Sequence, residues 1–522
     1  MVRRGASARR VVLTAVVALA AAITGFVGHG VAYSSSARFV GKLAPASFES
    51  APCPRKSPPA RALAKARCGY LVVPENRLKA NGRTIRLAVA IIPSLSPRPA
   101  PDPIVFLSGG PGSDSFADAS LVTDAGLNRD RKLIVLSQRG TVNDSPALMC
   151  PEIARYYARR VGLVYDAPST GRIYVQAAAD CRRRLVAAGI DLSAYDDDQN
   201  AADVADLRKA LGIRQWNVFA HSYGTELALD YMRDYPAGIR SVVLDGVTWQ
   251  PVAAPGIFGW SAVRQAFDNM VAACAAQPRC RARYPNVAAT FMRLVNQLER
   301  RPVTTRVSLP GVRGRVKVVL DGGALVQWMI LETHDPTNFP LAVDELAHGR
   351  PQRVARFWAS VAGDPDANPF AYGMNLSIVC RDQVAFESAS ARVQAGQIAF
   401  PEFPASVQAQ APQEAFIGGG CKAWNVPPAP ASAIAVTKSA IPTLLESGTF
   451  DAQTGAQWAR YAARTLSNSI QTVYPGLAHG VFAKSRCADT VIVSFYRRPK
   501  APNTSCVASV KPAPFTIGPR LR

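Results

Sequence analysis

The sequence predicts an α/β protein with a mostly parallel sheet, helices on both faces of the sheet, and a large, mainly helical lid inserted before the last strands. Two patterns lead to this prediction. Up to about residue 249, short apolar runs alternate with segments of helical spacing, which is typical of strand–helix–strand units in a parallel sheet. The alternation then stops and resumes near residue 442, as expected when an insertion interrupts one domain.

The predicted strands of the first half are short and apolar. Thr84–Ile92 alternates before it becomes continuously apolar. Ile104–Leu107 and Leu133–Leu136 are brief apolar runs between glycines and polar turns, which is typical of strands buried on both faces. Trp216–Ala220 and Val242–Leu244 have the same character.

Helices and later strands complete the predicted order. Asp203–Leu211 has helical spacing and stops at Gly212, a residue type that often ends helices. Thr225–Arg233 is a second predicted helix, and strands return at Pro442–Leu445 and Thr472–Tyr474. The expected division is a first core segment over 44–249, a lid over 250–432 and a second core segment over 433–510.

The N-terminus predicts export. Four arginines among the first ten residues precede an apolar run over Val11–Val27, and the small residues Gly30 and Ala32 follow. This is the order of a charged region, an apolar region and a cleavage site in a signal peptide. A membrane-spanning helix needs about 20 apolar residues. A cleaved signal peptide over 1–32 is therefore favoured over an uncleaved anchor.

Ten cysteines agree with a secreted, periplasmic or cell-envelope location, because an even number usually forms disulfides in an oxidising compartment. Spacing favours pairing between sequence neighbours, while the sequence alone leaves the connectivity open. The favoured pairs are Cys53–Cys68, Cys150–Cys181, Cys274–Cys280, Cys380–Cys421 and Cys487–Cys506. The sequence has no Cys-x-x-Cys and no cysteine–histidine cluster, so we expect no metal site.

The net charge of +23 arises from 60 Lys and Arg against 37 Asp and Glu, and raises the question of a nucleic-acid partner. The basic residues are scattered, however, and no basic stripe is interleaved with aromatic residues. We therefore expect no nucleic-acid binding, and only a loose association with anionic surfaces of the cell envelope.

The segment Ala220–Gly224 stands between a predicted strand and a predicted helix. Its sequence, AHSYG, is similar to G-x-S-x-G, in which a serine on a tight, strained turn lifts its hydroxyl above the strand's carboxyl end. Small residues are needed there because strand and helix approach closely, and Ala220 adds only one methyl group to the pattern. Ser222 is the predicted nucleophile.

A serine hydroxyl attacks poorly unless a base removes its proton. In the chain order serine, acid, histidine, the base follows the last strand. Of the five histidines, only His479 does so, among the small residues of Gly476–Gly480. The others are His29 in the signal region, His221 beside the serine, and His334 and His348 in the lid.

The acid of the triad should follow the penultimate strand. Asp451 stands at the turn after the strand that begins at Pro442, where a carboxylate would fix the imidazole tautomer and stabilise imidazolium. Glu446 is expected inside that strand. Asp245, after the earlier strand Val242–Leu244, is the more serious competitor, and Asp451 is preferred over it.

Negative charge that develops on an attacked carbonyl needs N–H donors. The loop Ser108–Gly112 directly follows a strand, and its glycines let the backbone approach a substrate. One donor is assigned to the backbone of Gly110, with Gly109 as the alternative, and the other to that of Tyr223. No Gly-Lys-Ser/Thr follows this loop and no dinucleotide fingerprint occurs, so no cofactor is expected.

Together these motifs resemble, in order, those of exported tripeptidyl aminopeptidases, relatives of prolyl aminopeptidase with the α/β-hydrolase fold. The resemblance covers about Cys53 to Cys506. It rests on Gly109–Gly112 (GGPG), Ser137–Thr141 (SQRGT), His221–Thr225 (HSYGT), Leu244–Val247 (LDGV), Ser447–Asp451 (SGTFD) and Leu477–Gly480 (LAHG). The chain departs from the group at Ser137, where the group often has Asp, at Ala220, where it has Gly, and after Thr454, where Gly455 replaces the usual Pro. These departures leave the substrate open.

The resemblance implies cleavage near a free amino terminus through an acyl-enzyme on Ser222. A desolvated substrate ammonium needs a carboxylate partner, which the lid is expected to supply. The candidates are Glu332, Asp335, Asp344, Glu345 and Asp382. Asp382 matches a C-x-D pattern of the group.

Two other functions stay open at this point. An exported esterase or lipase-like hydrolase would use the same triad, because the fold does not decide the substrate. A silent envelope or binding protein would keep the scaffold without its chemistry, although loss of function usually deletes a catalytic residue. Acetylating the substrate's amino group separates a peptidase from an esterase, and a serine-directed probe separates both from a silent scaffold.

Overall fold

The computed structural model describes residues 45–521 except for 55–59, 80–81, 250–254, 333–335, 362–368, 411 and 413–414. The predicted signal peptide over 1–32 lies outside the described residues. Within the described part of the chain, no helix has both the length and the apolar character needed to span a membrane.

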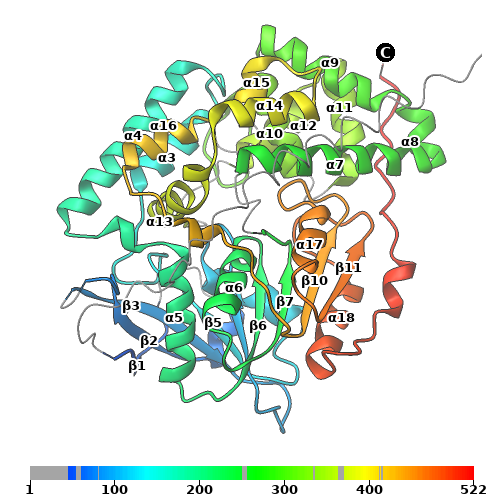
Figure 1. Cartoon of the computed structure of the whole chain (residues 1–522). Coiled ribbons are helices and arrows are strands. Elements are labelled where there is room, and N and C mark those ends of the chain that lie inside the picture. The colour runs from blue at the N-terminus through cyan, green and yellow to red at the C-terminus, as the bar shows by residue number, and fades with distance from the viewer. Residues whose placement is uncertain are drawn as a thin grey trace, which may run out of the picture.

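A nine-stranded sheet forms one half of the molecule (Figure 1). Its order is β1-β2-β3-β5-β4-β6-β7-β10-β11, with β1, β2, β3 and β5 joined antiparallel and every pair from β5 to β11 parallel. The strands are β1 (Ser47–Ser50), β2 (Arg67–Pro74), β3 (Thr84–Ile92), β4 (Ile104–Leu107), β5 (Leu133–Leu136), β6 (Trp216–His221), β7 (Ile239–Asp245), β10 (Thr443–Gly448) and β11 (Ser469–Tyr474). All residues of β4 and β5 are buried, as their apolar sequences predict.

Helices cover both faces of this sheet. On one face α5 (Asp197–Ala210), α6 (Tyr223–Asp234) and α17 (Ala456–Ala463) share an apolar core with the strands. On the other face α2 (Ser115–Asp124) and α18 (Arg486–Arg497) do the same. The predicted fold class, a mostly parallel sheet with helices on both faces, is confirmed.

A helical lid lies over the core (Figure 1). Between β7 and β10 the chain forms α7 (Pro255–Ala276), α8 (Pro278–Arg283), α9 (Val287–Arg300), α10 (Gly322–Glu332), α11 (Phe339–Ala347), α12 (Gln352–Val361), α13 (Tyr372–Ile378), α14 (Ala389–Ala399), α15 (Ala405–Gln410) and α16 (Ile417–Trp424). Two earlier helices, α3 (Pro151–Arg160) and α4 (Pro168–Ala187), lie at the same level, with α4 against α16. The covering layer therefore also draws on residues before 250.

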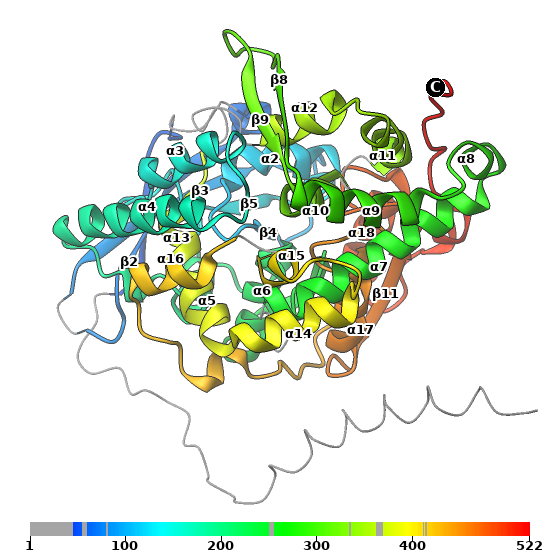
Figure 2. The same cartoon turned by 90° about the horizontal axis from the view of Figure 1, so that it is seen from above.

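Two further segments shape the lid. Strands β8 (Val303–Val307) and β9 (Val316–Leu320) form a separate two-stranded hairpin that extends outward from the lid (Figure 2). The C-terminal segment runs back along the lid, where Phe515 is buried in the lid core and the Gln277 side chain donates a 3.0 Å hydrogen bond to the Ala513 carbonyl. The last residues thus connect the end of the core to α7.

The five disulfides join the cysteine pairs favoured by spacing: Cys53–Cys68, Cys150–Cys181, Cys274–Cys280, Cys380–Cys421 and Cys487–Cys506. No free cysteine remains among the described residues. Each bridge closes a local loop, and Cys380–Cys421 joins two lid segments, so the pairing prediction is confirmed.

Arg139, in the segment after β5, is fully buried. Its guanidinium donates two hydrogen bonds to Asp203 of α5, at 2.7 and 2.8 Å. It also donates to the carbonyls of Glu75, at 2.7 Å, and Ala194, at 2.6 Å. The Ser137–Thr141 motif therefore stabilises the fold by joining three chain segments around one buried charge.

Replacing Arg139 by Ala should lower the free energy of unfolding by about 3 to 5 kcal/mol, because the buried Glu75 and Ala194 carbonyls lose their donor and Asp203 keeps only Arg77 of its two arginine partners. Arg61→Ala is the matched control, since Arg61 forms an exposed ion pair with Asp124 that contributes less than about 1 kcal/mol. Urea unfolding followed by tryptophan fluorescence measures both variants. Equal midpoints for the two would contradict a structural role for Arg139.

Candidate functional site

The site lies where the order of the sheet reverses, between β4 and β6. Leu107 at the end of β4 is the register partner of Ala220 near the end of β6, so the loops that follow the two strands begin side by side. Gly224 in the first turn of α6 is essential to this approach. A Cβ atom at Gly224 would lie 2.3 Å from the Leu107 carbonyl oxygen, closer than real Cβ contacts.

Ser222 occupies the turn between β6 and α6 in a strained backbone conformation, with φ of 56° and ψ of −129°. Hydrogen bonds hold this conformation from both sides. The Ser222 N–H donates to the carbonyl of Asp245 at 3.0 Å, and the Thr225 N–H donates to the Ser222 carbonyl at 2.8 Å. The sharp turn directs the hydroxyl away from the helix, as a nucleophile requires.

The structure brings Ser222, His479 and Asp451 together in one hydrogen-bonded chain. Ser222 Oγ lies 2.9 Å from His479 Nε2. His479 Nδ1 lies 3.0 Å from Asp451 Oδ2 and 3.2 Å from Oδ1. The three residues come from the turn after β6, the turn after β10 and the loop after β11. This geometry allows His479 to take the Ser222 proton while Asp451 fixes the imidazole tautomer.

Asp451 is held as an ionised carboxylate. Its Oδ1 accepts hydrogen bonds from the backbone N–H groups of Gln453, at 2.9 Å, and Thr454, at 2.8 Å. Burial alone would raise the pKa of Asp451, but His479 and the donors of Thr454 bring it below its ordinary value. The acid is therefore charged at neutral pH.

Thr454 is a site residue that the sequence analysis did not assign. Its hydroxyl donates to Asp451 Oδ2 at 2.6 Å and lies 3.0 Å from His479 Nδ1. Aspartate side chains often accept backbone N–H groups a few residues on in a turn, so the position of Thr454 shortly after Asp451 is the signal that could have identified it.

The two rival acids have other partners. Asp245 is fully buried at the end of β7, and its carboxylate accepts the N–H of Val481 at 2.9 Å and the N–H of Phe482 at 3.0 Å. It therefore holds the loop that carries His479. Burial raises the pKa of Asp245 to about 6 despite these donors. Glu446 lies inside β10, as expected, and accepts a hydrogen bond from the Tyr474 hydroxyl at 2.7 Å.

His221 packs behind the histidine of the triad. Its ring centroid lies 5.0 Å from that of His479, and a Cβ atom on Gly480 would come within 2.6 Å of the His221 ring. Gly480 also has φ of 74°, which favours glycine. Burial, together with the neighbouring His479, lowers the pKa of His221 to about 3, so His221 is a neutral wall of the site.

A pocket of about 470 Å³ opens over the triad. It is lined by Gly109, Gly110, Ser113, Asp118, Leu121, His221, Ser222, Phe370, Gln453, His479, Gly480, Phe482, Ala483 and Lys484. Phe370 belongs to the lid, so lid and core form the pocket together. A pocket of this size accommodates a few residues of a peptide or a small ester.

The predicted N–H donors lie beside the nucleophile. A Cβ atom on Gly109 would come within 2.9 Å of Ser222 Cβ, so the glycine loop lies directly against the serine. Gly110 has φ of 113°, a conformation that favours glycine. Tyr223 is the first residue of α6, where backbone N–H groups have no acceptor within the helix. The assignment of Gly110 and Tyr223 as donors to an oxyanion stays a prediction.

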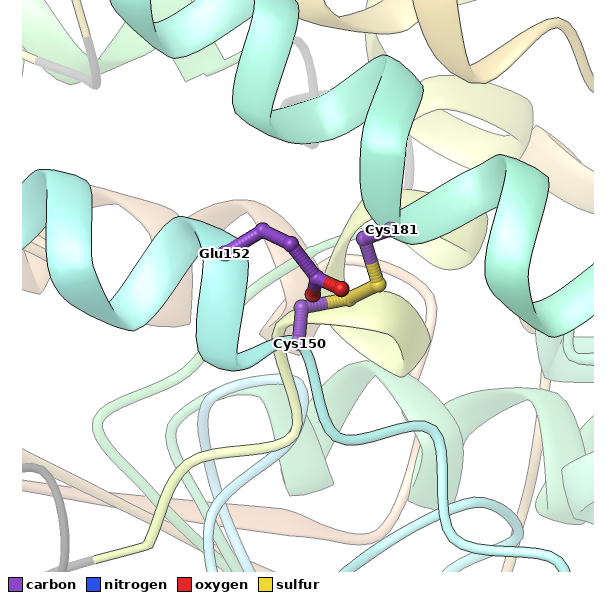
Figure 3. A group of neighbouring side chains, drawn as sticks. All are labelled: Cys150, Glu152 and Cys181. Atoms are coloured by element: carbon purple, nitrogen blue, oxygen red, sulfur yellow. A yellow bond between two sulfur atoms is a disulfide. The ribbon is translucent and has the colours of Figure 1, made fainter.

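Cys150, Glu152 and Cys181 form the one group of neighbouring metal-ligand side chains in the described part of the chain (Figure 3). The two sulfur atoms are bonded to each other as a disulfide. Glu152 accepts a 2.8 Å hydrogen bond from the Arg184 guanidinium. A metal needs thiolates and a free carboxylate, so we assign no metal to this group.

Replacing Asp245 by Asn should slow the labelling of Ser222 by a serine-directed fluorophosphonate about tenfold. In Asn an NH₂ group replaces one carboxylate oxygen and faces backbone N–H donors of the loop that carries His479, so a hydrogen bond to that loop is lost. Such a hydrogen bond is worth about 1.5 kcal/mol. Thermal stability at pH 8 should not fall. Because the folded-state pKa of Asp245, about 6, exceeds the ordinary value of about 3.9, stability falls as the pH rises from about 4 to 6, and the ionised carboxylate opposes folding at pH 8.

The matched control is Glu446→Gln, which alters the buried carboxyl that pairs in register with Asp245. Glu446 accepts hydrogen bonds from Tyr474 and Thr472 of β11, which an amide oxygen can also accept, so labelling should proceed at the wild-type rate. Wild-type labelling by Asp245→Asn, or slow labelling with a matching loss of stability, would show that Asp245 does not position His479.

Comparison with known proteins agrees with this geometry. The profile of the alpha/beta hydrolase fold family matches residues 102–482, a span that includes Ser222, Asp451 and His479. Serine protease Hip1 of Mycobacterium tuberculosis is 24% identical over 477 residues, which cover 86% of this chain and 88% of that protein.

Two further relatives match over shorter spans. Carboxylesterase B of Mycobacterium tuberculosis is 26% identical over 228 residues, which cover 41% of this chain and 43% of that protein. Tripeptidyl aminopeptidase of Streptomyces lividans is 26% identical over 191 residues, which cover 34% of this chain and 35% of that protein. The resemblance to aminopeptidase-like hydrolases inferred from the motifs is thereby confirmed. With its sheet order and the serine turn between β6 and α6, the chain belongs to the α/β-hydrolase fold family and is a serine hydrolase.

Proposed function

We propose that the protein is an exported aminopeptidase-like serine hydrolase that releases short N-terminal peptides or residues from peptides. The observation that carries the proposal is the hydrogen-bonded chain from Asp451 through His479 to Ser222, which opens into a pocket shared by core and lid. Similarity to proteins named serine protease and tripeptidyl aminopeptidase supports peptides as substrates. The disulfides and the N-terminal sequence support export.

The proposed reaction has two steps. In the first, His479 Nε2 takes the Ser222 proton as Oγ attacks the scissile carbonyl, and the imidazolium then gives that proton to the departing amine. The C–N bond breaks and an acyl-enzyme remains on Ser222. In the second, His479 activates a water molecule that releases the acid product and restores the serine. Backbone N–H groups of Gly110 and Tyr223 stabilise the oxyanion in both steps.

An aminopeptidase must also bind a substrate ammonium. Of the five candidate carboxylates, Asp335 and the side chain of Glu332 lie outside the described residues. Asp344 is bound by Arg283 and Glu345 by Arg353, each at 2.8 Å, so both are already neutralised. Asp382 is buried in the π-helical segment Val379–Gln383, next to the helix that begins after the nucleophile.

Asp382 belongs to a buried acidic group around Tyr223. Its Oδ2 accepts the Asp197 N–H at 3.2 Å, and Asp197 in turn accepts a hydrogen bond from the Tyr223 hydroxyl. The adjacent Gln383 donates to Glu226 at 3.0 Å. Burial raises the pKa of Asp197 to about 7 and that of Asp382 well above its ordinary value. A bound ammonium would favour the ionised form that burial disfavours, so we propose Asp382 as its partner.

Hydrolysis of chromogenic peptide amides should depend on both Ser222 and a free amino terminus. We expect Ser222→Ala to lose at least about 1,000-fold in kcat, because the nucleophile is removed. Acetylating the substrate should abolish cleavage by wild type. Paired free and acetylated tripeptide and single-residue amides measure both effects and give the length of the released fragment.

Indifference to acetylation would contradict the aminopeptidase proposal. If activity still needed Ser222, it would favour the second candidate, an exported carboxylic ester hydrolase with the same triad. The match to carboxylesterase B is the observation that favours this candidate.

Replacing Asp382 by Asn should raise KM about tenfold for free-amine peptides, because a charge-assisted hydrogen bond is lost. Labelling of Ser222 by a serine-directed fluorophosphonate, which has no ammonium, should not change. Asp344→Asn is the control, since it removes a lid carboxylate already bound by Arg283. An equal loss of peptide cleavage and of fluorophosphonate labelling in Asp382→Asn would show that Asp382 supports the fold and does not bind the amine.

A further inference from the structure

The hairpin β8–β9 carries a concentrated positive charge. From 300 to 320 the sequence has six Lys and Arg and no acidic residue. Four of these cations lie on its strands and outer turn and are exposed: Arg306, Arg313, Arg315 and Lys317. None of the four forms an ion pair with a carboxylate of the described residues. The hairpin extends beyond the lid body (Figure 2), so this charge faces solvent.

Pairing within the hairpin places like charges opposite each other. Arg306 of β8 and Lys317 of β9 are cross-strand partners, and both side chains are exposed. Like charges directly opposite on a pair of strands destabilise the pair. The Arg315 guanidinium, which donates to the Arg306 carbonyl at 2.7 Å, adds a third cation at the same place. Because this repulsion lowers the stability of the hairpin, it indicates a binding partner whose negative charge neutralises the three cations.

The outer turn also exposes one apolar side chain. Val312 is 45% exposed and stands directly before Arg313. An exposed aliphatic side chain next to cations with long aliphatic stems is typical of segments that enter the headgroup region of a membrane. The hairpin has no aromatic residue to stack on bases, which disfavours a single-stranded nucleic acid as its partner.

We propose that the β8–β9 hairpin binds a membrane surface rich in anionic lipid headgroups and thereby holds the enzyme at that surface. Arg306, Arg313, Arg315 and Lys317 contact the headgroups, and Val312 enters the interface. The proposal concerns a surface outside the pocket, so it stands or fails independently of the substrate. The sequence predicted only a loose attraction of a basic protein to anionic surfaces, whereas this proposal assigns the attraction to one surface, the β8–β9 hairpin.

Charged residues on an exposed hairpin can also prevent strand-to-strand aggregation. Preventing aggregation requires charged side chains, but these need not all be positive. A mixture of acidic and basic residues would avoid the repulsion between Arg306 and Lys317. Uniform positive charge with an exposed valine therefore favours an anionic surface.

The test is co-sedimentation of the full chain with phosphatidylcholine vesicles that contain either no phosphatidylglycerol or 30% of it, at about 0.1 M NaCl. The hairpin variant changes Arg306, Arg313, Arg315 and Lys317 to Gln. The control variant changes four exposed cations elsewhere, Arg98, Lys209, Arg214 and Arg460, to Gln and so has the same net charge. Each cation at an anionic surface is worth about fivefold in partitioning.

We expect wild type to bind only the anionic vesicles, and the hairpin variant to bind them at least about 30-fold more weakly. The control variant should lose less than about threefold, and Val312→Asn should lose a few-fold. Equal losses in both charge variants, or equal binding of wild type to neutral vesicles, would overturn the proposal.

Folding and charge are checked separately. Replacing the three arginines by Lys should keep binding, because charge and not guanidinium shape is required. Labelling of Ser222 by a fluorophosphonate should be normal in the hairpin variant, and Ser222→Ala should bind vesicles as wild type does. If the hairpin variant aggregates without vesicles but its soluble fraction still binds them fully, the cations only prevent aggregation and the proposal is wrong.

Discussion

The close packing of α6 against the end of β4 is the constraint on which the rest of the site depends. Gly224 lies so near the Leu107 carbonyl that a side chain at this position could not fit. This contact forces the strained conformation of Ser222 and brings the glycine loop after β4 against the serine. Because strain at one residue is stable only when its surroundings hold it, the hydrogen bonds from Ser222 to Asp245 and from Thr225 to Ser222 belong to the same constraint.

Buried carboxylates organise the site in three different ways. Asp451 is charged and bound by N–H donors, Thr454 and His479, so it can stabilise imidazolium. Asp245 holds the backbone of the histidine loop from a strand that ends beside Ser222. Asp382 and its neighbours Asp197 and Glu226 surround Tyr223 with buried carboxyl groups whose pKa values burial raises. The charged forms of Asp245 and Asp382, whose pKa values burial raises, oppose folding, whereas the lowered pKa of Asp451 means that its charge is favoured in the folded protein.

The lid combines enclosure with attachment. Its Phe370 lines the pocket, and the backbone of Ala371 donates to the Gly112 carbonyl at 3.0 Å, so the lid is bound directly to the predicted oxyanion loop. The C-terminal segment packs Phe515 into the lid core, which joins the lid to the end of the chain. On its outer side the lid carries the basic hairpin. One insertion thus shapes the pocket and, in our proposal, also places the enzyme at an anionic surface.

The sequence by itself determined the α/β fold class and the order of the strands along the chain. It also predicted Ser222 as nucleophile and His479 as base, and it preferred Asp451 over Asp245 as the acid. These follow from local pattern, because buried strands, tight turns and chain order are visible in neighbouring residues. It also favoured the correct cysteine pairs, since each bridge closes a short loop. Only the tertiary structure decided between Asp451 and Asp245, which both follow buried strands and differ in what their carboxylates face. It alone showed Thr454 at the histidine and Arg139 as a link between three segments. Such roles depend on contacts between residues that are far apart in the chain and come together only when the sheet has formed, so no local sequence pattern predicts them.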